Sequence, residues 1–418
     1  MRRTVVVIAA SALLLLGAAP VSASAGELLI TTSTTLTADH VGNVVIGASG
    51  VTLDCAGHRV VGSGAPDTVG IRADEVTDVT IRNCVVTGFA PTGIYAYGSR
   101  GLRLDGNTVT GSPDHNVYLP ESPGAVIVGN TIRNGGAYGI VLQHSPGALI
   151  RDNIATGHAW AGFALVDGSS GATVSSNTSS RNGDGFHVEP AADLSLTHNV
   201  ARDNVNFGFV INGVTNSRIA ANTVTGNGLD GFNIQASSSL DIEANVARAN
   251  GGNGLYIESS PDCRFIGNTA SGNGGLGIWV SYGSDRATVR QNRAAGNADS
   301  GIRVYFAADA RLTGNTATGN GNSGFDFGTA ANPRVEGNIA RANSVAGFGL
   351  FEATTGGTFA GNVAVRNGSF GFVLDKGPTG NTLTDNTAYA NGEIDALQTD
   401  TAGPNTWLHN HFGTQVGF

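Results

Sequence analysis

The densest group of ionisable side chains lies in the segment NGDGFHVEP, residues 182–190, which contains Asp184, His187 and Glu189. In an extended strand alternate side chains point to one face, so His187 and Glu189 would emerge side by side. A carboxylate next to an imidazole orients the ring and raises its pKa toward neutral pH, which suits general acid or base catalysis. We therefore take His187 as the candidate base, with Glu189 as its orienting partner.

A second ionisable group precedes the first by about three repeats of the sequence, and it contains Asp114, His115 and Tyr118. At about 4.8 Å per stacked strand, the two groups would lie about 14 Å apart. Tyr118, like Tyr256, is a candidate proton donor or stacking platform. The predicted catalytic set is thus Asp114, His115, Tyr118, Asp184, His187 and Glu189.

Aromatic and amide side chains fill many of the alternate positions that follow a recurring glycine. Aromatic rings are flat platforms with a polar tip, and amides or carboxylates fix the direction of hydroxyl groups. Such a face suits an extended glycan, although aromatic residues also favour outward strand positions merely because they fit a pleated surface. The predicted binding residues are Tyr95, Tyr97, Asn212, Asn233, Gln235, Tyr256, Glu258, Trp279, Arg303 and Tyr305.

The elements that hold these residues follow from an internal repeat. One asparagine recurs at intervals of 22, 23 or 24 residues, and a glycine recurs beside it at steps of 23 or 24, with Asn116 in the one vacant glycine place. We expect this break to mark an unusual backbone or a functional loop. The asparagines are Asn83, Asn107, Asn130, Asn153, Asn177, Asn199, Asn222, Asn245, Asn268, Asn292, Asn315, Asn338, Asn362, Asn386 and Asn410.

Each repeat predicts three short strands. In residues 231–253, Phe232 and Ile234 alternate with polar residues, and so do Leu240 and Ile242. Period two indicates strands, and units this small bury their apolar positions only by stacking. The sequence therefore predicts an all-β fold, a three-sheet parallel β-helix of roughly 15 coils of about 23 residues. The asparagines would mark a left-handed bend after the second strand, and their stacked side chains would bond along the axis.

The amino-terminal residues and the composition limit the class of protein. Arg2 and Arg3, an apolar stretch and Ala23-Ser24-Ala25 predict a secretory signal over residues 1–25, so we expect an exported protein without a membrane anchor. A net charge of −9 with 13% charged residues argues against nucleic-acid binding. We expect a cap segment at 26–50, the β-helix at 51–412 in one elongated domain, a tail at 413–418, and a monomer.

Cysteines and possible metal ligands are few. Cys55 and Cys84 lie about one coil apart, where a disulfide would clamp the first coils, although two buried free thiols are the alternative. Cys263 is expected to be a core residue. One Met and no Cys-His motif argue against copper, while His115, His144, His158 and His187 in successive repeats leave a surface metal site open. Asp184, Glu189, Asp230 and Glu258 leave Ca²⁺ open as a cofactor, against a solvated face.

Units such as NTVTGNGLDGF, residues 222–232, resemble the right-handed parallel β-helix repeat proteins of the pectin-lyase-like superfamily. VTLDCAGH (51–58) and VTIRNC (79–84) resemble its periplasmic copper-processing and carbohydrate-binding branch. The resemblance covers most of residues 45–412. Uronan epimerases and lyases of this fold carry Asp-Pro-His where Gly185-Phe-His-Val-Glu189 stands here, and the motifs of its pectin hydrolases are absent from the required strands.

The resemblance and the residues together predict a secreted protein that binds an extended, uronan-like polysaccharide along its first sheet. Whether it also cleaves or epimerises that polymer stays open, with a lyase or C5-epimerase favoured over a hydrolase. The alternative is a non-catalytic binding or scaffold protein of the copper-processing type.

Overall fold

The computed structural model describes residues 5–7, 19–21 and 26–417, and the elements found in them are strands joined by turns. The predicted signal, residues 1–25, lies almost wholly outside these residues. Within the described ranges no helix has the length and apolar character needed to span a bilayer. The chain divides into two compact units, residues up to 205 (unit 1) and from 206 onward (unit 2).

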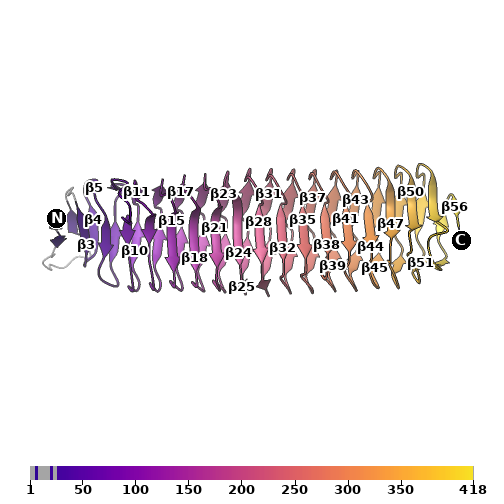
Figure 1. Cartoon of the computed structure of the whole chain (residues 1–418), viewed down its shortest axis with the longest axis horizontal. Helices are drawn as coiled ribbons and strands as arrows, with labels where there is room; N and C mark the ends of the chain where they lie inside the picture. The colour runs from indigo at the N-terminus through magenta and orange to yellow at the C-terminus, as the bar shows by residue number, and fades with distance from the viewer. Residues whose placement is uncertain (1–4, 8–18, 22–25, 418) are drawn as a thin grey trace. The chain divides into compact units, whose positions relative to one another are not determined.

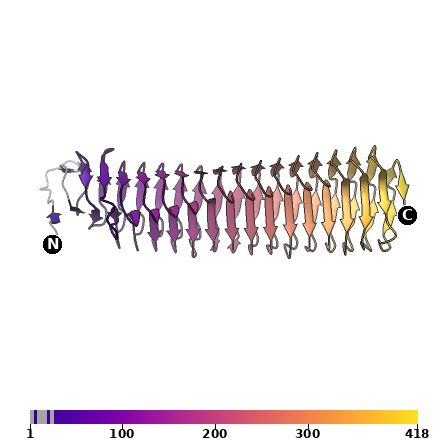
Figure 2. The same ribbon diagram turned by 45° about the horizontal axis from the view of Figure 1, so that its top comes forward.

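In each unit, strands one repeat apart pair in parallel and form three sheets, seen as rows of arrows in Figure 1 and Figure 2. The solenoid has about 17 turns of about 23 residues, rather than the roughly 15 expected. One reason is that residues 26–50 already contain strands of all three sheets. Two further short strands are β25 (Ala191–Ala192) in unit 1 and β29 (Val214–Thr215) in unit 2.

The first sheet contains the strands at the recurring glycine. In unit 1 these are β1 (Val5–Val7), β3 (Glu27–Ile30), β6 (Val44–Ile46), β9 (Ile71–Arg72), β12 (Thr92–Tyr95), β15 (His115–Pro120), β18 (Tyr138–Gln143), β21 (Ala161–Val166) and β24 (Asp184–Glu189). In unit 2 they are β28 (Phe209–Asn212), β32 (Phe232–Gln235), β35 (Leu255–Glu258), β38 (Ile278–Ser281), β41 (Ile302–Tyr305), β44 (Phe325–Gly328), β47 (Ala346–Phe351), β50 (Phe370–Asp375), β53 (Ile394–Gln398) and β56 (Gln415–Val416).

The second sheet contains the strands that precede the recurring asparagine. In unit 1 these are β2 (Ala19–Val21), β4 (Thr34–Leu36), β7 (Thr52–Asp54), β10 (Thr80–Arg82), β13 (Arg103–Asp105), β16 (Val126–Val128), β19 (Leu149–Arg151), β22 (Thr173–Ser175) and β26 (Ser195–Thr197). In unit 2 they are β30 (Arg218–Ala220), β33 (Asp241–Glu243), β36 (Arg264–Ile266), β39 (Thr288–Arg290), β42 (Arg311–Thr313), β45 (Arg334–Glu336), β48 (Thr358–Ala360), β51 (Thr382–Thr384) and β54 (Thr406–Leu408).

The third sheet contains the strands that follow the recurring asparagine. In unit 1 these are β5 (His40–Val41), β8 (Arg59–Val61), β11 (Val85–Thr87), β14 (Thr108–Thr110), β17 (Thr131–Arg133), β20 (Ile154–Thr156), β23 (Thr178–Ser180) and β27 (Val200–Arg202). In unit 2 they are β31 (Thr223–Thr225), β34 (Val246–Arg248), β37 (Thr269–Ser271), β40 (Arg293–Ala295), β43 (Thr316–Thr318), β46 (Ile339–Arg341), β49 (Val363–Val365), β52 (Thr387–Tyr389) and β55 (His411–Phe412).

The core is built by the predicted alternation of side chains. Phe232, Ile234 and Ile242 are fully buried, whereas the outward Asn233 and Gln235 are half-buried. Equivalent residues of successive coils then stack on one another, because parallel in-register pairing places them about 4.8 Å apart. The prediction of which side chains point inward is therefore confirmed.

The recurring asparagines form a buried hydrogen-bonded ladder. The Asn245 side chain donates to Oδ1 of Asn268 at 3.1 Å and to the Ile219 carbonyl at 2.8 Å, and the Asn245 backbone amide donates to the same Oδ1 at 2.9 Å. The predicted bonding along the axis is confirmed, but the predicted bend is displaced by one residue. The left-handed residue precedes the ladder asparagine, as at Ala244 with φ of 51°.

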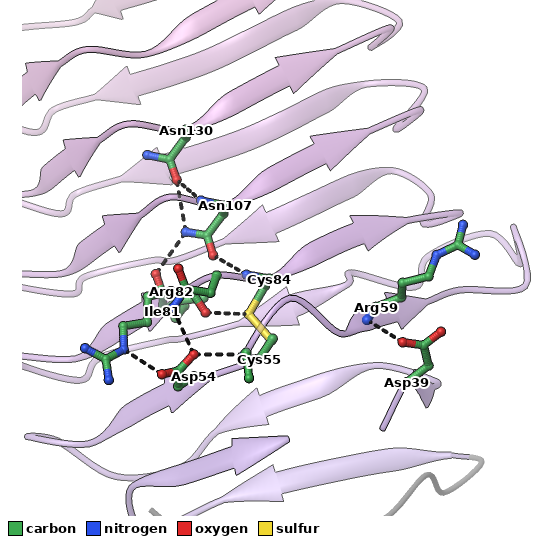
Figure 3. The surroundings of a disulfide bond; sticks show 11 residues. Asp39, Asp54, Cys55, Arg59, Ile81, Arg82, Cys84, Asn107 and Asn130 are labelled. Atoms are coloured by element: carbon green, nitrogen blue, oxygen red, sulfur yellow. Dashed lines mark hydrogen bonds and ion pairs between the residues drawn. A yellow bond between two sulfur atoms is a disulfide. The ribbon is translucent and has the colours of Figure 1, made fainter. Parts of the chain in front are cut away.

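Asn83 was assigned wrongly to the asparagine ladder. It is itself the left-handed residue, with φ of 54°, and the next residue, Cys84, occupies the ladder place, its amide donating to Oδ1 of Asn107 at 3.0 Å. Cys84 is joined to Cys55 by a disulfide, with Cα atoms 4.7 Å apart (Figure 3). The predicted disulfide is therefore confirmed, with Cys84 at a ladder position, while Cys263 is a buried free thiol.

A second asparagine ladder, which the sequence analysis did not identify, follows the first by five residues. In unit 2 it is continuous and includes Asn227, Asn250, Asn273, Asn297, Asn320, Asn343, Asn367 and Asn391. Each side chain donates to the oxygen of the next member. At Asn391 the acceptor is instead a carboxylate of the same coil, because Asp395 Oδ1 lies 2.7 Å from the Asn391 side-chain nitrogen.

Candidate functional site

In unit 1, His187 lies between two carboxylates on β24. Its Nε2 is 3.0 Å from Glu189 Oε1, and its Nδ1 is 3.6 Å from Asp184 Oδ2. Hydrogen bonding to Asp184, and then to Glu189, raises the pKa of His187 although burial opposes this. The predicted trio is thus brought together. The geometry favours an imidazolium, which has no lone pair for accepting a proton.

His115, on β15, has the opposite environment. Its Nδ1 is buried and has no hydrogen-bond partner in the described structure, with Asp114 Oδ1 3.5 Å away. Burial lowers the pKa of His115, with Asp114 opposing. The Tyr118 ring lies edge-on at 4.9 Å between ring centroids, so the second predicted group is also brought together. His115 is therefore a neutral imidazole that could accept a proton.

Two aromatic residues of this face were missed by the sequence analysis. Tyr138 contacts His115 at 5.5 Å and Trp160 at 5.2 Å between centroids. Burial, and then the charges of Glu189 and Asp184, raise the pKa of Tyr138. Tyr138 was missed because β18 begins one residue before the recurring glycine, and Trp160 because it lies just before β21 begins. The first residues of the six-residue strands β15 and β18 lie side by side in the sheet, where His115 pairs with Tyr138.

Asn116 has a structural role, which corrects the expectation of an unusual backbone or functional loop. It lies inside the regular strand β15 and is buried. Its Oδ1 accepts from the Ser112 amide at 3.1 Å, and its Nδ2 donates to the Val109 carbonyl at 3.3 Å. These are the bonds that a second-ladder asparagine would make at Gly135. Asn116 therefore substitutes for the side chain that Gly135 lacks.

His158 occupies the next place of the same ladder and is buried. Its Nε2 lies 3.1 Å from the Asn116 side-chain nitrogen, and its Nδ1 lies 2.9 Å from Asn182 Oδ1. Burial lowers the pKa of His158 to about 4. His158 thus belongs to the scaffold and not to a surface metal site.

The tyrosines at the start of the unit 1 face border a shallow hollow of about 310 Å³. Tyr95, Tyr118, Asp114 and Arg72 line it, and the rings of Tyr95 and Tyr118 are 5.7 Å apart. The Tyr118 hydroxyl donates to Gln143. Arg72 pairs with Asp74, which leaves the hollow without an uncompensated cation.

Among the remaining predicted binding residues, those of β28, β32 and β35 in unit 2 occupy paired positions on adjacent strands. Tyr97 is 38% exposed and hydrogen-bonds Glu121, which raises its pKa. In unit 2, Asn212 is exposed at the end of β28, and Gln235 is half-buried at the end of β32. Asn233 donates to Asp230 at 3.3 Å, and Asn253 donates to the same carboxylate at 2.9 Å.

A hollow of unit 2 has a volume of about 400 Å³ and three aromatic rings in its lining, those of Trp279, Tyr305 and Phe351. We call it the unit 2 hollow. Two glycines at outward positions create the space, because a Cβ on Gly328 would lie 2.5 Å from the Tyr305 ring and one on Gly349 would lie 2.3 Å from the Phe351 ring. Phe351 was missed because the list of outward positions ended at Tyr305.

Trp279 links the hollow to Tyr256. Their ring centroids are 4.9 Å apart, and the Tyr256 hydroxyl donates to Glu258 Oε2 at 2.9 Å. Burial, and hydrogen bonding to Glu258, raise the pKa of Tyr256 to about 12. The Trp279 Nε1 is buried without a hydrogen-bond partner in the described residues.

The charged residues of the unit 2 hollow fall into two groups. Arg303 forms ion pairs with Asp326, whose Oδ2 lies 2.7 Å away, and with Asp299 at 3.5 Å. Glu352 accepts from the Tyr305 hydroxyl at 3.1 Å, and Lys376 completes the lining. Asp326, Glu352 and Lys376 were missed because they lie beyond the last outward position considered.

The described residues contain no group of three or more His, Cys, Asp or Glu side chains that could hold a metal ion. The four carboxylates considered for Ca²⁺ have protein partners instead: Asp184 and Glu189 bind His187, Asp230 binds Asn253, and Glu258 binds Tyr256.

The chain resembles several solved structures, all at low identity. An A-module of a mannuronan C-5 epimerase of Azotobacter vinelandii is 20% identical, with 96% of this chain and 92% of that chain covered and a TM-score of 0.41. The periplasmic alginate epimerase AlgG is 13% identical, covering 84% and 78%, with a TM-score of 0.43. A DFA-IIIase of Arthrobacter chlorophenolicus without its lid is 13% identical, covering 70% and 84%, with a TM-score of 0.46.

No curated protein matches the chain. A family model described as periplasmic copper-binding protein (NosD) matches residues 233–369. That segment contains no His or Met, and burial raises the pKa of its one thiol, Cys263, to about 11. Copper needs thiolate, thioether or imidazole ligands in a cluster, so the residues present do not fit it.

A second family model, described as right handed beta helix region, matches residues 21–179 and 165–294, which together exceed half of the chain. The parallel in-register sheets of both units agree with this match. The chain therefore belongs to the right-handed β-helix family.

Proposed function

We propose that this chain is an exported protein that binds an extended polysaccharide on the outward face of its first sheet, with the unit 2 hollow holding sugar rings. The observation that carries the proposal is the hollow itself, about 400 Å³ in volume and lined by Trp279, Tyr305 and Phe351. A sugar ring has an apolar face and a hydroxyl edge. Aromatic platforms with adjacent charged groups match both.

The paired variant Trp279→Ala with Tyr305→Ala tests this binding. Removal of each ring should weaken affinity by about 1 kcal/mol, or roughly fivefold, so the pair should weaken it about 25-fold. The matched control is Tyr389→Ala, because Tyr389 is 50% exposed on β52 of the third sheet. Affinity electrophoresis against a panel of neutral and acidic glycans is the measurement. Equal retardation of both variants and the wild type would remove the hollow from the proposal.

Export is a separate part of the proposal, and it follows from the signal predicted over residues 1–25. The intact mass of the protein recovered from the medium or periplasm should correspond to a chain that begins after Ala25. A mass that includes residues 1–25 would contradict it. We also propose a monomer, for which sedimentation should return a mass close to that of one chain.

Lyase or epimerase activity on uronans is a second candidate function, favoured by His115. The neutral His115 ring lies on a face with Tyr118 and Tyr138, and because its Nδ1 is buried, its Nε2 would be the atom that takes a proton from a sugar carbon. If so, His115→Ala should abolish turnover, whereas His187→Ala should leave some. A lyase product absorbs in the ultraviolet, and an epimerase exchanges the C5 proton with solvent. Absence of both signals on all uronans tested would exclude this function.

A further inference from the structure

We propose that the ligand of the unit 2 hollow is a neutral polysaccharide, a glycan that carries neither carboxylate nor sulfate groups. This inference rests on the proposed function, and it replaces the uronan-like polymer expected from the sequence with a different chemical class. The argument comes from the charges around the hollow and from one distinctive residue, Lys376.

The arginine of the hollow is not available to an acidic sugar. Arg303 donates from Nε to Asp326 Oδ2 at 2.8 Å, and its terminal nitrogen lies 2.7 Å from the same oxygen and 3.5 Å from Asp299. Asp326 is only 8% exposed. Separating this pair to bind a substrate carboxylate would leave a buried charge uncompensated, which costs several kcal/mol.

The other charges give the hollow a negative excess. Glu352 accepts from Tyr305 and from the Thr329 hydroxyl at 2.9 Å, and no contact ion pair neutralises it in the described structure. Asp375 lies beside Lys376 in the sequence and interacts with its charge. The lining itself has two carboxylates, Asp326 and Glu352, and two cations, Arg303 and Lys376. The negative excess around it comes from Asp299 and Asp375, which interact with those two cations. With a chain charge of −9, this field repels a polyanion.

Lys376 is the only lysine among the 418 residues, all other basic side chains apart from histidine being arginine. It is exposed, lines the hollow, and makes no contact ion pair in the described part of the chain. An ammonium offers three hydrogen-bond donors, and the Glu352 carboxylate offers acceptors. Donors and acceptors on one rim match the hydroxyl groups of a neutral sugar, each of which both donates and accepts.

The single lysine also provides the test. Reductive methylation with ¹³C-formaldehyde labels Lys376 and the amino terminus only, and it keeps the lysine charge. The labelled protein is titrated with β-1,3-glucan, arabinoxylan and galactomannan, and separately with alginate and polygalacturonate. At least one neutral glycan should shift the Lys376 signal with an affinity unchanged by NaCl. The uronans should bind at least about tenfold more weakly.

The possible results separate this inference from the proposed function. A uronan that shifts the Lys376 signal with a salt-sensitive affinity equal to or above that of every neutral glycan would overturn the neutral class and leave polysaccharide binding intact. Neutral-glycan binding without a Lys376 shift would also overturn it, because the ligand would lie elsewhere. Failure of every glycan to bind would overturn the proposed function. The variant Glu352→Gln with Asp375→Asn should narrow the difference between the two classes.

Discussion

The second asparagine ladder is continuous in unit 2 but altered in unit 1. In unit 1 its places are occupied by Ser112, Gly135, His158, Asn182 and Asn204. Asn116 reaches across to restore the bonds that Gly135 cannot make. The comparison teaches that residues other than asparagine can continue the ladder, since Asn116 and His158 make several of its buried bonds. Unit 1 therefore contains a titratable group inside its scaffold, and the unit 2 ladder consists of amides that do not titrate.

The outward faces differ as well. In unit 1, the long strands β15, β18 and β24 carry histidines, tyrosines and carboxylates that already contact one another. In unit 2, Gly328 and Gly349 remove two side chains from the face and leave a hollow among aromatic rings. The side chains of the unit 1 face therefore interact mainly with one another, whereas the unit 2 face has room for a ligand.

The largest effect should come from the feature that both units share, the inward apolar residue. Phe163→Asp in unit 1 and Phe232→Asp in unit 2 each bury an unpaired charge, at an expected cost of about 4 kcal/mol or more. Both phenylalanines are fully buried. The outward change Ile154→Asp is the control, because Ile154 is 42% exposed on β20. Urea unfolding is the measurement, and normal stability of either phenylalanine variant would contradict the common packing.

Reduction of the disulfide should affect unit 1 alone. The Cys55–Cys84 bridge closes a sequence separation of 29 residues. Its loss should cost about 3 kcal/mol through the entropy of the unfolded chain. In a repeat protein this loss stays near the bridge. Hydrogen exchange should therefore accelerate at β7 and β10 and remain unchanged at β45. Non-reduced peptide mapping must also show the two cysteine peptides joined.

Acid should weaken unit 1 more than unit 2, because of His158. Its pKa in the folded chain is about 4, below the ordinary 6.5. As pH falls from 6.5 toward 4, the unfolded chain binds a proton that the folded chain does not, so stability is lost by about 2 kcal/mol. The change His158→Asn should remove this loss. Local hydrogen exchange at pH 7 and 4.5 measures it, and equal acid sensitivity of the variant would contradict the assignment.

The smallest effect concerns the two histidines on the unit 1 face. Nuclear magnetic resonance titration should place the midpoint of His187 above 6.5 and that of His115 below it. Hydrogen bonds to carboxylates raise the pKa of His187, and burial lowers the pKa of His115. His187 then contributes stability at low pH that is lost as pH rises through its folded pKa. Asp184→Asn should lower the His187 midpoint and leave that of His115 in place. Coincident midpoints would contradict the contrast.

Much of the fold could be predicted from sequence because spacing and alternation are local and repeated. The sheets, the inward residues such as Phe232 and the cysteine pair all follow from that periodicity. The compensation of Gly135 by Asn116 could not be predicted, since it joins residues of different coils and different sheet positions. The unit 2 hollow was missed for another reason. It is made by absent side chains at Gly328 and Gly349, and an alternation pattern records only the side chains that are present.

The second ladder of unit 2 has a direction. Every amide donates toward the next coil along the chain, so the dipoles of the column add, much as peptide dipoles add along a helix. The donor end would carry partial positive charge, and the Asp395 carboxylate lies there to receive it. A column of identical amides with a distinct end can change length by whole coils. After deletion or duplication of one complete repeat, every amide donor of the ladder still has an acceptor in the next coil. Removing part of a repeat would leave at least one donor without its acceptor.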